Sequence, residues 1–151
     1  MKTFEVVIRG KASQYDLDPK LVAAIIYQES SGKYYAVRME NGFYKRYIEN
    51  LILPISEKLL RSCSYGLMQI MGQTARELGY SDSFDELLKP EINIELGCKL
   101  LKKHLDKTGD VSKALLKYNG GADPSYPERV LDHITSKRIY SLITEDAPCL
   151  D

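Results

Sequence analysis

Residues 19–30 read PKLVAAIIYQES and have the pattern of an amphipathic helix. Three apolar side chains recur at helical spacing and would share one face, those of Val22, Ile25 and Ile26. Asp18 is a favourable N-cap, and the proline that follows it suits the first helical position. A serine and a glycine at positions 31 and 32 predict where the helix ends. The sequence therefore predicts one well-delimited helix, and the rest of the chain can be placed around it.

Glu29 lies in the last turn of this helix and continues its apolar face. The negative end of the helix dipole and the apolar surroundings both disfavour a carboxylate, so we expect a raised pKa. A glutamic acid that stays protonated near neutral pH is the proton donor that glycosidic cleavage requires. Taken alone, the segment favours a plainer interpretation, in which Glu29 is a boundary residue whose carboxylate reaches solvent, because amphipathic helices often end this way.

Helical patterns dominate the remainder of the chain. They cover residues 4–15, 56–60, 74–78, 90–105, 110–118 and 127–143. Ser83 and Glu86 have the spacing of a capping box, and Asp110 is a plausible N-cap for a helix with Val111 on its inner face. Residues 33–65 are less regular and rich in tyrosine, with Asn41-Gly42 as a turn signal that suits a small hairpin. The expected fold class is α+β, predominantly α-helical, in one domain spanning residues 1–151.

The composition excludes several classes of protein. A chain of 151 residues with 44% apolar residues is long enough for one domain with a real core. The 21 basic and 21 acidic side chains balance, which argues against a nucleic-acid binder. No apolar run approaches the length of a membrane span. Residues 1–10 contain no apolar stretch followed by a small-residue cleavage site, so we expect no secretory signal there.

The three cysteines, Cys63, Cys98 and Cys149, are widely spaced and form no CxxC pair. A zinc ribbon is therefore excluded. One disulfide is possible, but free thiols are the favoured interpretation. His104 and His133 are isolated, and no HExxH motif is present, so no metal ligands are expected.

A second segment changes the interpretation of Glu29. Residues 66–71 read GLMQIM, Glu29-Ser30 precedes them, and YNGG follows at 118–121. These three landmarks, in this order, resemble the soluble lytic transglycosylase family, the lysozyme-like SLT domain. The flanking stretches YDLDP at 15–19 and PEINIELG at 90–97 resemble the same family. The resemblance covers roughly residues 4–135, which is most of the chain.

The resemblance implies a lysozyme-like, mostly helical domain with a groove for a glycan and Glu29 as its single catalytic residue. It also implies that Gln69 and Met71 line the sugar sites, and that Tyr118 and Asn119 face the acid and the glycan. We expect two further substrate contacts, Ser64 and Tyr44. Plain core packing remains an alternative role for Met71 and Tyr118.

The implied reaction is cleavage of peptidoglycan between N-acetylmuramic acid and N-acetylglucosamine. It leaves a 1,6-anhydromuramyl end and needs no cofactor or metal. The implied partner is the glycan strand, without nucleic acid or a membrane span, and the protein is expected to be a monomer. It would act on the cell wall, either in the periplasm, outside the cell or delivered by a phage.

The sequence also departs from the family pattern. Lys33-Tyr34 stands where the family often has Asn-Pro, and Gly72 stands where proline commonly follows the second methionine. An insertion of about twenty residues lies within residues 36–64, judged against ordinary loop lengths. Phe43, Tyr44 and Tyr47 lie in it, and we expect these rings either to form a wall of the groove or only to pack the extra segment onto the body.

Two other functions stay open at this point. Glu40, Glu49 or Glu57 from the insertion is placed to supply a second carboxylate, as a hydrolytic muramidase would require. A catalytically silent peptidoglycan-binding module is the other alternative, and the presence of Glu29 argues against it.

Overall fold

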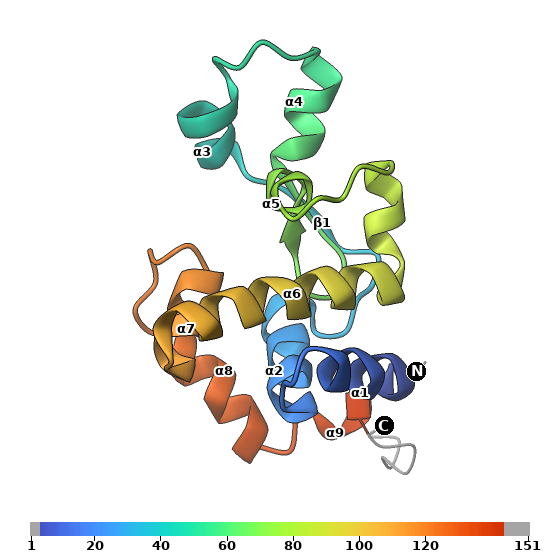
Figure 1. The fold of residues 1–151 in the computed structure, drawn as a ribbon, viewed down its shortest axis with the longest axis vertical. Helices are drawn as coiled ribbons and strands as arrows, with labels where there is room; N and C mark the ends of the chain where they lie inside the picture. The colour runs from blue at the N-terminus through green and yellow to red at the C-terminus, as the bar shows by residue number, and fades with distance from the viewer. Residues whose placement is uncertain (1–3, 144–151) are drawn as a thin grey trace.

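The computed structural model describes residues 4–143 and is mostly helical with one small sheet (Figure 1). The expected class, α+β with α predominant, is confirmed. The elements follow in the order α1 (Glu5–Gln14), α2 (Pro19–Ser30), β1 (Val37–Met39), α3 (Asn41–Phe43), the π-helix η1 (Tyr44–Ile48), α4 (Ile55–Arg61), β2 (Cys63–Tyr65), β3 (Ile70–Met71), α5 (Gly72–Glu77), the 3₁₀-helix η2 (Phe84–Leu88), α6 (Pro90–Thr108), α7 (Val111–Tyr118), α8 (Tyr126–Thr135) and α9 (Tyr140–Ile143). Within the described residues, no helix is both long and apolar enough to cross a membrane.

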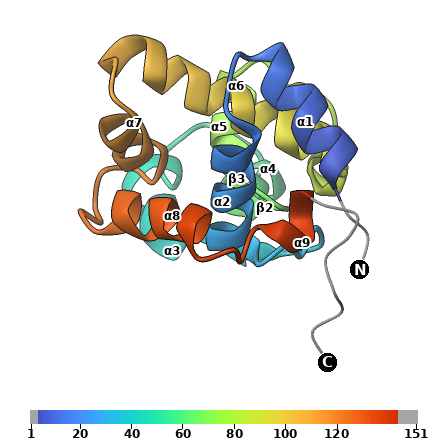
Figure 2. The ribbon, with the colours of Figure 1, turned by 90° about the horizontal axis from the view of Figure 1, so that it is seen from below.

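Helix α2 lies in the middle of the helical body, with α1, α6, α7, α8 and α9 around it (Figure 2). Its predicted bounds are confirmed, and residues 21–26 are buried on every side rather than on one face. The Asp18 carboxylate accepts a hydrogen bond of 2.8 Å from the backbone N–H of Lys20, as expected for an N-cap. Ser31 then ends the helix in the left-handed conformation, with φ of 52°. The buried helix thus carries Glu29 to the edge of the core.

The sheet is antiparallel, with β2 between β1 and β3. Ser64 in β2 pairs with Arg38 on one side and with Met71 on the other. Between β2 and β3 the chain makes a tight turn, where Gly66 adopts a φ of 71°. A Cβ atom at Gly66 would lie 2.5 Å from the side-chain nitrogen of Asn93, so the turn requires glycine for packing as well as for conformation.

The side chain of Asn93 in α6 holds the turn between β2 and β3 in place. Its side chain is fully buried, and its Oδ1 accepts a hydrogen bond of 2.7 Å from the backbone N–H of Met68. Its Nδ2 donates to the carbonyl oxygens of Tyr65 and Leu87, at 2.8 Å each. The amide therefore satisfies three backbone groups that have no water to bind.

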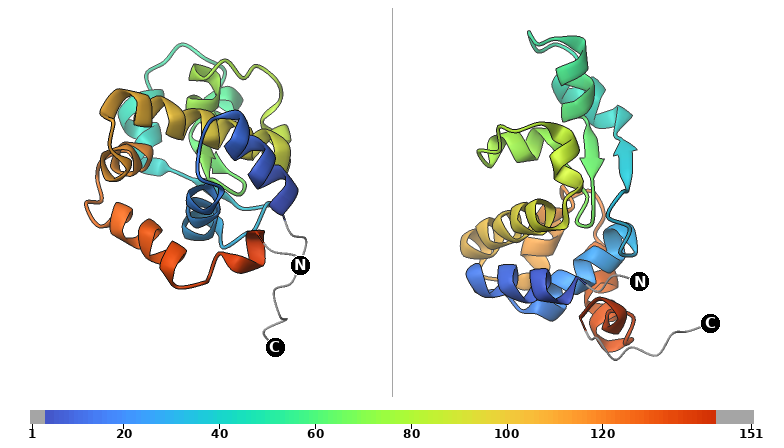
Figure 3. Two further views of the ribbon diagram at one scale, coloured as in Figure 1. Left: turned by 60° about the horizontal axis from the view of Figure 1, so that its bottom comes forward. Right: turned by 90° about the vertical axis from the view of Figure 1, so that its right-hand side faces the viewer.

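Residues 40–62 leave the sheet after β1 and return to it at β2, and we call them the lobe. The lobe extends away from the helical body (Figure 3). The helix predicted near residues 56–60 is confirmed as α4. The turn predicted at Asn41-Gly42 is wrong, because these residues begin a helical stretch that continues into η1. A turn dipeptide specifies a hairpin only when strands flank it directly, and here the strands flank the whole lobe.

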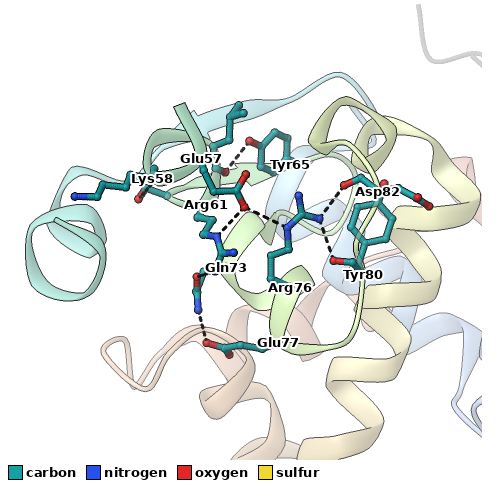
Figure 4. Close-up of polar contacts among 11 residues, drawn as sticks. Glu57, Lys58, Arg61, Tyr65, Gln73, Arg76, Glu77, Tyr80 and Asp82 are labelled. Atoms are coloured by element: carbon teal, nitrogen blue, oxygen red, sulfur yellow. Dashed lines mark hydrogen bonds and ion pairs between the residues drawn. The ribbon is translucent and has the colours of Figure 1, made fainter. Parts of the chain in front are cut away.

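A cluster of partly buried charged side chains joins α4 of the lobe to α5 (Figure 4). The carboxylate of Glu57 accepts hydrogen bonds from Arg61 at 2.9 Å and from Arg76 at 3.4 Å. Although partial burial opposes it, these two guanidinium groups lower the pKa of Glu57. The guanidinium of Arg76 also lies 4.0 Å from the ring centre of Phe84, a cation–π contact. The lobe is therefore anchored at its base by side chains as well as by strand pairing.

Other local predictions are wrong as well. Ser83 makes no side-chain cap, and Glu86 pairs with Lys89 and not with the start of the helix. Val111 is 40% exposed rather than inward-facing, and it is the first residue of α7. The last helix is divided into α8 and α9 by a connection in which Lys137 has a positive φ of 60°.

The two described cysteines carry free thiols. Cys98 is fully buried, and burial raises the pKa of its thiol to about 12. Cys63 is partly buried at the end of the lobe. Cys149 lies outside the described residues.

Candidate active site

A cleft of about 460 Å³ lies beside the end of α2, between the sheet and the helices α6 and α7. Of the seven site residues expected from the sequence, six line it: Glu29, Ser64, Gln69, Met71, Tyr118 and Asn119. The other lining residues are Arg38, Glu40, Phe43, Thr74, Glu77, Leu100, Lys103, His104, Lys117 and Gly120. Segments separated by up to ninety positions in the sequence thus meet at one cleft, as the three landmarks predicted.

Glu29 stands in this cleft with its carboxyl held in place by a tyrosine. The hydroxyl of Tyr126 donates a hydrogen bond of 2.6 Å to Oε1 of Glu29. Burial raises the pKa of Glu29 above its ordinary value, although the hydrogen bond from Tyr126 and the charge of Arg38 act in the opposite direction. The side chain is thus partly buried in a cleft instead of extending freely into solvent, and a carboxyl with a raised pKa is the kind of group that general acid chemistry requires.

The serine after Glu29 links α2 to the GLMQIM segment. The hydroxyl of Ser30 donates to the carbonyl of Leu67 at 2.8 Å and lies 3.1 Å from the carbonyl of Ile26. The hydroxyl of Tyr118 donates to the carbonyl of Met68 at 2.8 Å from the other side. These two contacts explain why the three sequence landmarks belong together, since each holds a backbone carbonyl of the same turn.

Gln69 lines the cleft, but its amide is used inside the protein. Its nitrogen donates to the carbonyls of Gly66 at 2.9 Å and of Ala36 at 3.2 Å, and its oxygen accepts from the hydroxyl of Ser64 at 2.9 Å. Its backbone has a positive φ of 48°, which is unfavourable for a residue with a Cβ atom. The amide network offsets that cost and holds β1 to the turn. Gln69 and Ser64 therefore line the cleft, and their side chains also hold the surrounding backbone in place.

Tyr126 is the functional residue that the sequence analysis missed. Tyr118 was expected to face the acid, but its hydroxyl is bonded to a backbone carbonyl, and Tyr126 makes the contact with Glu29 instead. Burial and the nearby Glu29 raise the pKa of Tyr126, so its hydroxyl keeps its proton and acts as a donor. The available signal was a Tyr-Pro pair at the start of α8.

The lobe contributes to the cleft through different residues than expected. Phe43 and Glu40 line the cleft, whereas Tyr44 does not. Tyr47 packs against Phe43 with ring centres 5.0 Å apart and is itself 57% exposed. The helical course of residues 41–48 directs Phe43 inward and turns Tyr44, the next residue, away from the cleft.

The charged groups of the cleft are divided between its walls. Glu29, Glu40 and Glu77 are acidic, Arg38 pairs with Glu40 at 2.6 Å, and the α6–α7 wall carries Lys103, His104 and Lys117. No group of three or more His, Cys, Asp or Glu side chains in residues 4–143 is arranged to hold a metal ion.

A larger hollow of about 670 Å³ lies on the outer side of α7 and α8. It is lined by Ser112, Lys113, Leu116, Pro124, Pro127, Glu128, Leu131, Asp132 and Thr135. None of the motif residues lines it, so the cleft at Glu29 is the candidate active site.

Comparison with known proteins agrees with this geometry. The family model described as the transglycosylase SLT domain matches residues 6–129. The chain is 35% identical over 135 residues to a protein named transglycosylase from Enterobacteria phage PRD1. The match covers 84% of this chain and 41% of that relative, so the chain spans about two fifths of the length of the relative it matches.

Proposed function

Because the chain belongs to the transglycosylase SLT domain family, we propose that it is a lytic transglycosylase that cleaves the glycan strand of peptidoglycan. The observation that carries the proposal is the Glu29 carboxyl, which is partly buried in a cleft, has a raised pKa and accepts a hydrogen bond from Tyr126. The scissile bond joins C1 of N-acetylmuramic acid to O4 of N-acetylglucosamine.

In the first step, the Glu29 carboxyl donates its proton to O4 as the bond from C1 to O4 breaks. The N-acetyl group of the substrate stabilises the positive charge that develops at C1. In the second step, the resulting carboxylate removes the proton from the C6 hydroxyl, and O6 bonds to C1. The product is a 1,6-anhydromuramyl end, and Glu29 is protonated again. The hydroxyl of Tyr126 donates to the carboxylate between the two steps and so stabilises it.

A hydrolytic muramidase is the second candidate, and one observation favours it. Glu40 lines the same cleft as Glu29, and its charge acts on the Glu29 carboxyl. A second carboxylate near the acid is what a hydrolase uses to activate water. The other two candidates from the lobe are unsuitable, because Glu57 is bound by two arginines and Glu49 is exposed outside the cleft.

The products distinguish the two functions. We expect digests of purified peptidoglycan to contain anhydromuramyl ends, and we expect EDTA to leave the rate unchanged because no step requires a metal. Mass spectrometry separates the two outcomes, since an anhydro end and a reducing end differ by the mass of one water. Glu40→Gln should still yield anhydro ends. Reducing ends that disappear in Glu40→Gln would establish the hydrolase instead.

We expect the contact between Tyr126 and Glu29 to affect how the rate of lysis depends on pH. The hydrogen bond lowers the pKa of Glu29, so Tyr126→Phe should raise it. Since the first step needs the protonated carboxyl, the alkaline limb of the rate profile should move to higher pH. The rate at the optimum should fall roughly tenfold, because the carboxyl loses its orienting donor. Lysis of cell-wall suspensions followed across pH checks both effects.

Tyr118→Phe is the matched control, because its hydroxyl bonds a backbone carbonyl of the same cleft wall. It should lower thermal stability and leave the alkaline limb in place. A limb that stays fixed in Tyr126→Phe as well would contradict the assigned contact.

A further inference from the structure

The α6–α7 wall of the cleft carries a concentration of positive charge that the two reaction steps do not use. Lys103 and Lys117 are exposed at the cleft, and His104, which is partly buried, lines it with them. In residues 4–143 neither lysine forms an ion pair, whereas Lys102 beside them is paired with Asp106 at 2.9 Å. The acidic side chains of the cleft, Glu29, Glu40 and Glu77, belong to other parts of the chain, so the excess of positive charge is confined to the α6–α7 wall.

Burial, reinforced by the charges of Lys103 and Lys117, lowers the pKa of His104. The lowered pKa favours the neutral imidazole, which presents one donor and one acceptor beside the two lysines. Such an arrangement suits a carboxylate, which can take charge-assisted hydrogen bonds from the lysines and a neutral one from the ring. A neutral sugar has no negative charge with which two unpaired ammonium groups could pair.

Peptidoglycan supplies carboxylates at a defined place. The muramic acid unit carries a lactyl group, and from it extends a peptide stem that contains acidic residues. We propose that Lys103, His104 and Lys117 bind the carboxylates of this peptide stem and make the protein prefer stem-bearing, acidic glycan. The proposal rests on the proposed function for the identity of the substrate. It adds a specificity contact from α6 and α7 in the same cleft as Glu29.

The test compares two tetrasaccharide fragments of peptidoglycan that differ only in charge. One carries stems with free carboxylates, and the other carries the same stems with carboxamides. Binding is measured by calorimetry on Glu29→Gln protein, so that the fragment is not consumed. We expect about tenfold tighter binding of the carboxylate fragment at low salt, because two charged contacts contribute. The preference should shrink as salt is added.

The variant Lys103→Gln with Lys117→Gln should reduce this preference to near twofold or less. The matched control is Lys107→Gln with Lys113→Gln. It removes the same two charges from the same two helices, at positions that do not line the cleft. The control should keep the preference, although Lys107 contributes weakly to the potential at His104.

An unchanged preference in the Lys103 and Lys117 variant would overturn the proposal. A third fragment, the same tetrasaccharide without stems, supplies a further outcome: if the parent protein binds it more tightly than the other two and the variant abolishes that preference, the cluster binds the lactyl carboxylate of the sugar itself and the proposal is overturned. Binding of neither fragment would overturn it too. Failure of the proposed function has a separate signature, the absence of anhydro ends from digests by the active protein, and binding to Glu29→Gln protein does not depend on it.

Discussion

Glu29→Gln should lower the rate of cell-wall lysis at least about a hundredfold, on the order of what general acid–base catalysis contributes. Glutamine keeps the shape of the side chain and can still accept the hydrogen bond from Tyr126, but it has no acidic proton to donate to the glycosidic oxygen. The measurement is the initial rate of lysis per folded molecule, with folding checked by circular dichroism. Near-normal lysis by a folded Glu29→Gln protein would rule out the mechanism proposed above.

The same variant should report on stability. Since burial raises the folded-state pKa of Glu29, its protonated form favours folding at acid pH, and this contribution is lost as pH rises from about 4.5 through the raised value. Glutamine does not titrate, so the variant does not lose this part of the free energy of unfolding as pH rises. The melting temperature of Glu29→Gln relative to the parent should therefore increase with pH. A relative melting temperature that falls with pH would contradict the raised pKa.

Asn93→Ala should have the largest effect on stability. The substitution leaves three buried backbone groups without a partner, at Tyr65, Met68 and Leu87. Each unsatisfied buried group costs about 1–3 kcal/mol, so we expect a loss of roughly 3–5 kcal/mol in the free energy of unfolding. For a chain of this size the melting temperature should fall by about 10 °C or more.

Asn50→Ala serves as the control, because Asn50 is exposed in the lobe. It should change the free energy of unfolding by no more than about 0.5 kcal/mol. A similarly small change in Asn93→Ala would show that the turn before β3 holds its conformation without the Asn93 amide. Chemical denaturation of the three proteins measures all of these differences.

Much of the fold could be predicted from the sequence, because most helices carry their own limits. The N-caps Asp18 and Asp110 both accept the expected backbone hydrogen bonds. The course of the lobe could not be predicted, since Asn41-Gly42 has the same local preference in a hairpin and at a helix start. The packing of Phe43 and Ile48 decides between them, and that packing depends on residues far away in the sequence.

The candidate site was predictable to the extent that short motifs report contacts between segments. Ser30, the GLMQIM turn and Tyr118 lie in three motifs, and the structure joins them by hydrogen bonds. Tyr126 belongs to none of these motifs and reaches Glu29 only because α8 packs along α2. The basic wall was also missed, because its lysines come from two helices and look like ordinary solvated charges in each.

The pairing of Met39 with Cys63 at the base of the lobe has a consequence for how such a protein diversifies. The chain departs from the sheet and rejoins it at adjacent positions on neighbouring strands. A connection of any length can close such a pair, down to a two-residue hairpin turn, without displacing either strand. Residues 40–62 thus form an exchangeable cassette. Replacing them would change Glu40 and Phe43 at the cleft, and with Glu40 one charge that acts on Glu29, while Glu29, Tyr126 and the hydrogen bond between them would stay in place. With this connection, one wall of the cleft can be exchanged while the backbone that carries Glu29 and Tyr126 keeps its place.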